Sequence, residues 1–264
     1  MGRWMNRVHF QISLFHTMNE QRTNRAIRAS SNFLSSKILL VYRTLVALFS
    51  TFFFFFSLSI YPAHFFRFLT NWSWLGLTLY FLLAAYISWY HSRSNYRSAI
   101  TPYATIFDML FHSAATFALV VTVIYWGLLS IDYYSKTTVQ GQFTSLTPHA
   151  FNTVFIILEL LLSKNEFSRL GFLWPILWIV LYNVLSAILR VTGTPWPYFF
   201  LEVIYSGPIW GVFVAFLVSF AFIILLYFFL SLLALIRDYF GRAKPKTSND
   251  IESPRSEENL ANVM

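Results

Sequence analysis

The chain of 264 residues contains no cysteine, which excludes disulfide bonds, thiolate-bound zinc, iron–sulfur clusters and every mechanism with a cysteine nucleophile. Charged residues are also scarce, at 11% of the chain against roughly 25% in an ordinary globular protein. Ionised side chains therefore cannot cover a water-soluble particle of this size. Hydrophobic residues make up 57% of the sequence and aromatic residues 20%, so the composition predicts an integral membrane protein.

Six segments are long and apolar enough to cross the hydrocarbon layer, which takes roughly 20 residues of helix. They are 38–61, 68–90, 106–131, 144–162, 172–189 and 208–236. The sequence thus predicts an all-α, polytopic membrane helix bundle with six transmembrane helices over residues 37–238. A basic arm over 1–36 precedes the bundle, and a polar tail over 239–264, predicted to be disordered, follows it.

Lysine and arginine residues fall mainly on one side of these segments. Fifteen lie in the arm, the second and fourth loops and the tail, whereas Arg67, Lys136 and Arg190 lie on the other side and Arg43 lies within the first span. Because cytosolic segments are enriched in Lys and Arg, both termini are predicted to be cytosolic. Topology and contact with anionic lipid head groups then explain the net charge of +8, and no binding of nucleic acid is expected.

Polar residues within the spans need a reason, since an ionised group at mid-depth costs about 2.5–3.5 kcal/mol. In the fourth span, His149, Asn152, Ile156 and Glu159 follow the spacing i, i+3, i+7 and i+10, which predicts one shared helix face. His149 either bonds its own helix or a neighbouring span, or serves a site near the membrane interface. For Glu159 a structural hydrogen bond or a side chain that reaches the interface is favoured.

Three further groups have simpler interpretations. Arg43, Arg67 and Arg190 lie close to span ends, where their long side chains can reach the interface and anchor the topology. Asp108 and His112 share a helix face at i and i+4. They can bind a metal or relay a proton, but two ligands are fewer than a catalytic metal site supplies, so a structural pair is favoured.

Thr70 stands at the entry of the second span, on the same predicted side as the start of the fourth span. Thr70 and His149 can therefore share a leaflet and a depth. A hydroxyl with a nearby imidazole is the minimum for nucleophilic acyl transfer. A threonine at a helix start is also a common N-cap, so the topology permits the pair without selecting it.

Three segments resemble the androgen-induced-gene family of multi-pass membrane threonine hydrolases, which cleave fatty-acid esters of hydroxy fatty acids. The stretch Arg67-Phe68-Leu69-Thr70 is similar to the family's Lys-Phe-Leu-Thr, and the ten-residue spacing from His149 to Glu159 resembles that of the span with the family's catalytic histidine. The third segment resembles the family's Val-Thr-Gly…Trp…Tyr…Phe-Leu-Glu loop through Val191-Thr192-Gly193, Trp196, Tyr198 and Phe200-Leu201-Glu202.

The resemblance implies intramembrane hydrolysis of a lipid ester, with Thr70 as the nucleophile and His149 as the general base. Asn152, Asn71 or Glu159 would orient the imidazole or donate a hydrogen bond to the oxyanion. It implies no cofactor or metal, with membrane lipids and the lipid ester as partners. The endoplasmic reticulum is the expected compartment; the basic arm also resembles a mitochondrial presequence, which makes mitochondria the alternative.

Two other classes of function remain open. A non-catalytic lipid-binding scaffold or transporter would use the polar stripe of the fourth span as a path or interface, and Glu159 would then matter more than Thr70. A metal-dependent lipid hydrolase or desaturase needs several clustered histidines. The six histidines here are scattered over different segments, so this class is disfavoured.

Overall fold

The computed structural model describes residues 31, 33–62, 64–93, 101–130, 138–198, 201–202 and 209–242. Every regular element within these ranges is helical. The elements are α2 (Ser36–Ile60), the 3₁₀ turn η1 (Phe65–Arg67), α3 (Leu69–Arg93), α4 (Thr101–Ile124), the π-helical turn η2 (Tyr125–Leu129), α6 (Val139–Leu162), α7 (Leu173–Val191) and α9 (Ile209–Arg242). Most of the predicted basic arm, and the tail from residue 243 onward, lie outside the described residues.

Six helices in the described ranges are long and apolar enough to cross a membrane, which confirms the predicted six-span, all-α bundle. Several boundaries differ from the sequence prediction by a few residues, and two of them have a bearing on the fold. The fourth span begins at Val139 because the Thr138 hydroxyl accepts a hydrogen bond from the Gly141 N–H at 3.2 Å and caps the helix. Helix α9 continues to Arg242, beyond residue 236, where the sixth span was predicted to end.

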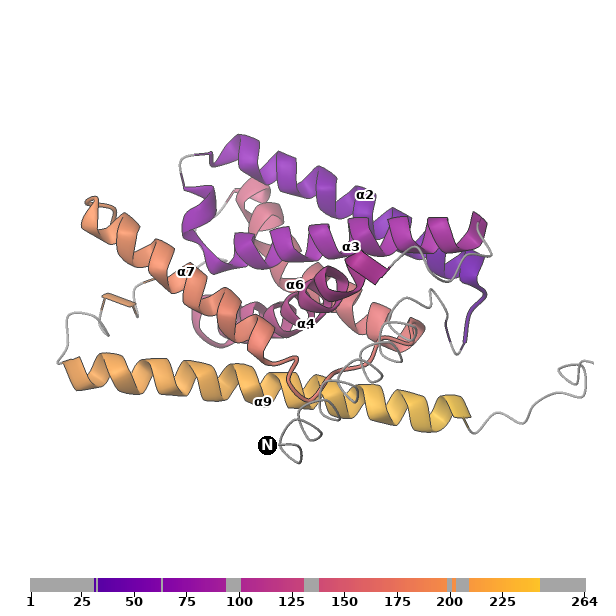
Figure 1. Cartoon of the computed structure of the whole chain (residues 1–264). Helices are drawn as coiled ribbons and strands as arrows, with labels where there is room; N and C mark the ends of the chain where they lie inside the picture. The colour runs from indigo at the N-terminus through magenta and orange to yellow at the C-terminus, as the bar shows by residue number, and fades with distance from the viewer. Residues whose placement is uncertain are drawn as a thin grey trace, which may run out of the picture.

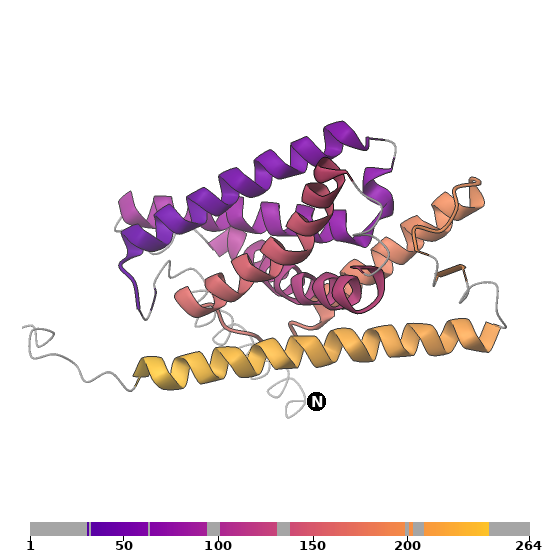
Figure 2. The ribbon, with the colours of Figure 1, turned by 180° about the vertical axis from the view of Figure 1, so that it is seen from behind.

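The helices form a bundle in which α4 is central (Figures 1 and 2). Helices α2 and α3 lie side by side along one edge, and α9 runs along the opposite edge. Of the α4 span, 67% is buried inside the protein, against 11% of the α9 span. Helix α7 starts close to the middle of α9 and diverges from it toward its own C-terminus.

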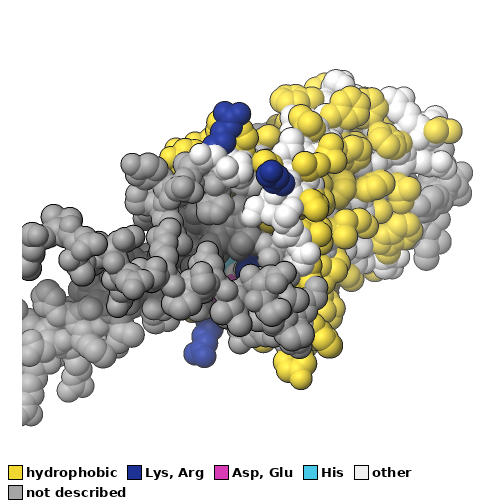
Figure 3. Space-filling model, turned by 90° about the vertical axis from the view of Figure 1, so that its right-hand side faces the viewer, with side chains coloured by type: hydrophobic (Ala, Val, Ile, Leu, Met, Phe, Trp, Pro, Cys, Tyr) yellow, Lys and Arg dark blue, Asp and Glu magenta, His cyan; other side chains and the backbone are white. Residues whose placement is uncertain are grey.

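Large apolar side chains cover much of the described surface (Figure 3). On α9 they include Trp210, Phe213, Leu217, Leu225 and Leu235, each more than half exposed. Apolar surface of this extent is unfavourable in water but is the natural boundary of a helix with lipid chains. The exposed faces of these helices are therefore assigned to lipid.

A buried ion pair joins α2 to α6. Arg43 and Glu159 are 2% and 0% exposed, and their side chains form a salt bridge of 2.6 Å. Tyr80 donates a hydrogen bond to Glu159 at 2.8 Å, and Arg43 donates one to Ser88 at 2.7 Å. The interpretation of Arg43 as an interfacial anchor is wrong, because packing of α2 against the bundle places its guanidinium opposite a carboxylate.

A second arginine closes the C-terminal end of α6. Arg237 of α9 donates hydrogen bonds to the carbonyl oxygens of Leu160 and Ser163, at 2.7 and 2.8 Å. Its Nε also bonds the Asp238 carboxylate at 2.8 Å. The last carbonyls of a helix have no partner within the helix and carry partial negative charge. Arg237 supplies both a donor and a positive charge there, and so fastens α9 to α6.

Candidate functional site

The predicted polar stripe of α6 faces the interior of the bundle. His149 is 7% exposed, and Asn152, Ile156 and Glu159 are fully buried, which confirms the shared face. The stripe nevertheless divides by depth, since ten residues of helix separate His149 from Glu159 by about 15 Å. The polar residues of the stripe therefore lie at different depths of the bundle and contact different residues.

Neither Asn152 nor Glu159 orients the imidazole in the described part of the chain. Asn152 donates its side-chain hydrogen bond to Ser73 of α3 at 2.8 Å. Glu159 accepts hydrogen bonds from Arg43 and Tyr80, and from Asn165 at 3.1 Å. Both residues form contacts between helices. Other groups must therefore orient the His149 imidazole, the role that was predicted for these two residues.

The His149 ring is fixed by α4 and by the π-helical turn that follows it. Its Nδ1 lies 3.2 Å from the carbonyl oxygen of Val121. A carbonyl can only accept, so Nδ1 carries the proton and Nε2 keeps its lone pair. Tyr125, in the first position of the π-helical turn, stacks on the imidazole with centroids 3.9 Å apart and planes 8° apart. Such turns occur frequently at functional sites.

The backbone around His149 is also tied to α4. Thr122 donates a hydrogen bond to the His149 carbonyl at 2.6 Å, and its hydroxyl lies 2.7 Å from that of Thr153. Thr153 in turn lies 2.9 Å from the carbonyl of Ala118, to which it donates. These bonds join α4 to α6 at the level of the His149 side chain.

Thr70 lies in the first turn of α3 and is 9% exposed. Phe68 has extended backbone, and its carbonyl oxygen accepts a hydrogen bond from the Trp72 N–H. Phe68 therefore occupies the N-cap position of α3, and Thr70 is not the cap. The hydroxyl oxygen of Tyr198 accepts the Leu69 N–H at 3.0 Å, which satisfies one orphan donor of the helix start. Asn71 donates its side-chain amide to the Phe65 carbonyl at 2.7 Å.

Tyr198 is a half-buried residue of the loop after α7. Burial raises the pKa of its hydroxyl, and hydrogen bonds from the Thr70 side chain and from the Leu69 and Thr70 backbone oppose the rise. The phenol therefore keeps its proton at neutral pH. Thr70 and Tyr198 form one hydrogen-bonded group at the start of α3.

The loop from Thr192 to Tyr198 is fastened to the same place. Helix α7 ends in a Schellman turn, in which Gly193 adopts φ +90° and Thr194 N–H bonds the Leu189 carbonyl at 3.0 Å. Arg67 then donates a hydrogen bond to the Pro195 carbonyl at 2.7 Å. The three segments that carry the family resemblance, remote in sequence, thus meet at one site.

Two adjoining cavities share four residues, Thr70, Leu129, His149 and Tyr198. The smaller cavity, of about 120 Å³, lies between α4, α7 and α9. The larger, of about 490 Å³, is rimmed by polar groups that include His64, Arg67 and Asn71. The structure therefore brings Thr70 of α3 and His149 of α6 together at the junction of two spaces of different character.

Sequence reasoning assigned no role to four groups of this site. The Val121 carbonyl is a backbone atom, which no side-chain pattern reveals. Tyr125 and Tyr198 belong to a protein rich in aromatic residues, with 15 tyrosines in all. Asn183 of α7 lines the smaller cavity, and an amide in the middle of a mainly apolar span was a signal that could have found it.

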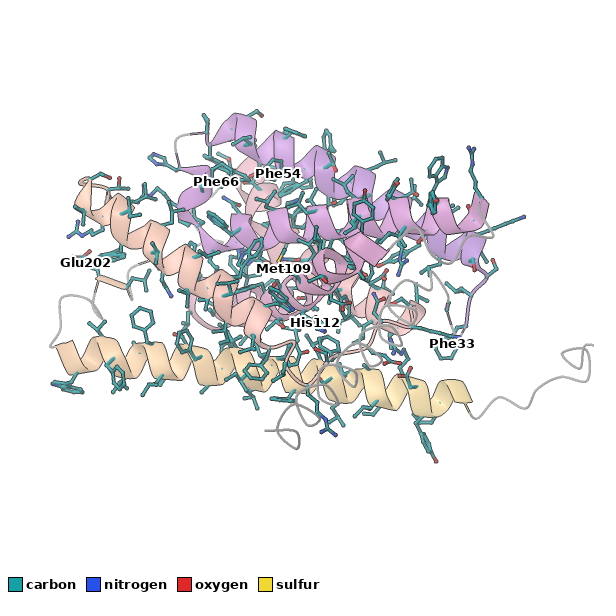
Figure 4. All side chains as sticks on the ribbon, viewed as in Figure 1. Phe33, Phe54, Phe66, Met109, His112 and Glu202 are labelled. Atoms are coloured by element: carbon teal, nitrogen blue, oxygen red, sulfur yellow. The ribbon has the colours of Figure 1, made fainter. Side chains whose placement is uncertain are left out.

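His112 serves a different part of the bundle. It is 1% exposed, and its Nε2 accepts a hydrogen bond from the Ser168 N–H at 3.3 Å. Its ring lies 5.6 Å from that of Tyr227, between α4 and α9 (Figure 4). His112 thus supports the loop before α7. Among the described residues, no group of three or more His, Asp or Glu side chains is placed to hold a metal ion.

No family model, curated protein or solved structure matches the chain. The fold defines its class as an integral multi-pass membrane protein built from six apolar helices.

Proposed function

We propose that the protein is an intramembrane lipid-ester hydrolase, a divergent member of the androgen-induced-gene family. Thr70 is its nucleophile and His149 its general base. The observation that carries the proposal is the junction of the two cavities, which both residues line. The hydrogen bond from Nδ1 to Val121 supports it further, because it leaves Nε2 of a neutral imidazole available as a base.

In the proposed reaction, the Thr70 hydroxyl oxygen attacks the acyl carbon while His149 Nε2 takes the hydroxyl proton. The tetrahedral intermediate then collapses, the bond from the acyl carbon to the alcohol oxygen breaks, and His149 returns the proton to that oxygen. Water attacks the acyl-threonine in the same way and releases the fatty acid. The Val121 carbonyl plays the orienting part that a carboxylate plays in a serine triad. We assign oxyanion stabilisation to the Tyr198 hydroxyl, which lines both cavities.

A site of this kind suits substrates that partition into lipid and present their ester close to the membrane interface. Fatty-acid esters of hydroxy fatty acids, or similar lipid esters, are the proposed substrates. The proposed topology has both termini in the cytosol, and the proposed compartment is the endoplasmic reticulum. The excess of Lys and Arg on one side of the spans supports the orientation.

The competing class, a scaffold or transporter, relies on the polar stripe of α6 as a path or an interface. Asn152 and Glu159 are instead fully buried and bonded to Ser73 and Arg43. Of the stripe, only His149 lines either of the two cavities described above. These contacts favour a role in helix packing for Asn152 and Glu159, and His149 is then the residue of the stripe that is available for chemistry.

Purified protein in detergent tests the proposal through hydrolysis of a p-nitrophenyl ester and labelling by a fluorophosphonate. Thr70→Ala and His149→Ala are each expected to lower hydrolysis at least about 100-fold, and Thr70→Ala to abolish labelling. Thr192→Ala is the control, because this exposed hydroxyl bonds only its own helix end, at Leu189. Activity like that of the wild type in either variant would remove that residue from the mechanism.

A further inference from the structure

Asn183 is the polar group of the smaller cavity that the proposed chemistry does not use. It lies in the middle of α7, is half-buried, and lines the cavity together with apolar residues such as Ile179, Phe222 and Ile223. No described residue forms a hydrogen bond with its side chain. An amide kept from water without a partner costs roughly 1–3 kcal/mol in proteins. This cost is offset when a ligand supplies the partner.

The other polar groups of this cavity are already engaged. The Ser219 hydroxyl donates to Ala215 of its own helix at 2.8 Å. Tyr182 donates to the Arg67 carbonyl at 2.8 Å, and Tyr198 belongs to the start of α3. The side-chain amide of Asn183 is therefore the polar group of this cavity that can hydrogen-bond a bound molecule.

The cavity reaches the outer surface of the bundle between α7 and α9, since Asn183 is half-buried and Ser219 is exposed. Its volume of about 120 Å³ compares with the cavity of about 150 Å³ that binds benzene in another protein. It thus has room for a segment of about five carbon atoms. Thr70 and His149 lie at its inner end, where it meets the larger cavity.

We propose that the smaller cavity holds one arm of the ester and that Asn183 hydrogen-bonds an oxygen atom carried by that arm. The inference rests on the proposed function and names its substrate class: esters with a keto or hydroxyl group close to the scissile bond, preferred over esters with two saturated arms. Asn183 is then a specificity residue. A site built to hydrogen-bond a substrate discriminates against the analogue that lacks the group, because its own polar atom is left unpaired.

Matched esters test this assignment. Two series of esters are compared, each with a six-carbon arm that is varied. The varied arm is the acyl arm in the first series and the alcohol arm in the second. Each series contains the saturated ester and esters that carry one keto group at successive positions of that arm. Wild-type kcat/KM is expected to favour one keto ester by about three- to tenfold. Asn183→Leu should bring that ratio to about one while the saturated ester is hydrolysed at least as fast. Ser219→Ala, in the same cavity, should keep the wild-type ratio. A preference that survives Asn183→Leu, or is missing in the wild type, would overturn the assignment.

A binding assay separates this inference from the proposed catalysis. In Thr70→Ala, the keto and saturated methyl hexanoates compete with a dansyl-labelled fatty acid for the cavity. The keto ester should displace the probe at about three- to tenfold lower concentration, and the added change Asn183→Leu should remove the difference. Discrimination in binding without hydrolysis by the wild type would refute Thr70 chemistry and support Asn183. Hydrolysis by the wild type with equal binding of both esters would refute the role of Asn183 alone.

Discussion

The Nδ1 atom of His149 donates a hydrogen bond to the carbonyl oxygen of Val121 across 3.2 Å. This bond joins α6 to α4 and determines which imidazole nitrogen keeps its lone pair. It uses a backbone oxygen, so the orienting group cannot be removed by a side-chain substitution. The stacked ring of Tyr125 is the part of the arrangement that mutation can reach.

Tyr125→Leu is expected to lower kcat for ester hydrolysis by about fivefold, because ring stacking of roughly 0.5–1.5 kcal/mol holds the imidazole plane. Tyr125→Phe keeps the ring and loses only the hydrogen bond from Ser145, which is 3.1 Å long. It should therefore retain kcat within about twofold. Steady-state kinetics of both variants check the point, and equal losses in the two would show that the hydroxyl matters instead of the stacking.

Tyr198→Phe is expected to lower kcat about 100-fold with a small change in KM, because the hydroxyl is assigned to the oxyanion. The phenyl ring should still pack against Phe68, whose ring lies 5.9 Å away. Thermal unfolding in detergent is the control for the lost bond to the Leu69 N–H. Unchanged kcat in a folded variant would remove Tyr198 from the reaction.

Arg43→Met is expected to destabilise the bundle by about 3–5 kcal/mol, since it leaves the Glu159 carboxylate buried without its ion partner. The double variant Arg43→Met, Glu159→Met should recover much of this loss, because no uncompensated charge remains. Denaturation of the detergent-solubilised protein measures both. If the single and double variants lose the same stability, the ion pair is not the source of the effect.

Gly171→Ala is expected to destabilise the protein by about 1–3 kcal/mol. A Cβ atom there would overlap the Tyr227 hydroxyl and lie 2.9 Å from His112 Nε2. Gly211→Ala on α9 is the matched control, because its added methyl group would meet nothing within 4 Å. The unfolding midpoint should fall for the first variant and hold or rise for the second. An unchanged midpoint for Gly171→Ala would show that the loop yields at no cost.

The helices were predictable because membrane thickness sets their length and hydropathy marks their position. The shared face of His149 and Glu159 followed from helical periodicity alone. The start of α6 at Val139 was missed because its first turns are polar, and only the cap at Thr138 shows that they are helical.

Contacts between helices were beyond the reach of the sequence. Arg43 and Glu159 are 116 residues apart in the sequence. The periodicity of one helix shows which of its faces is buried, but it does not predict which other helix packs against that face. The same holds for the smaller cavity, because residues of α3, α4, α6, α7 and α9 line it together. Topology permitted Thr70 and His149 to meet, and packing decided that they line the same cavities.

The most direct test of the central claim is to locate the covalent adduct formed by a fluorophosphonate on the wild-type protein. Mass spectrometry of the digested, labelled protein should find the modification on Thr70, at a yield that falls in His149→Ala. A hydroxyl cannot be phosphonylated selectively unless a base activates it, so the position of the adduct identifies the nucleophile. An adduct on another residue, or none on an active enzyme, would contradict the account.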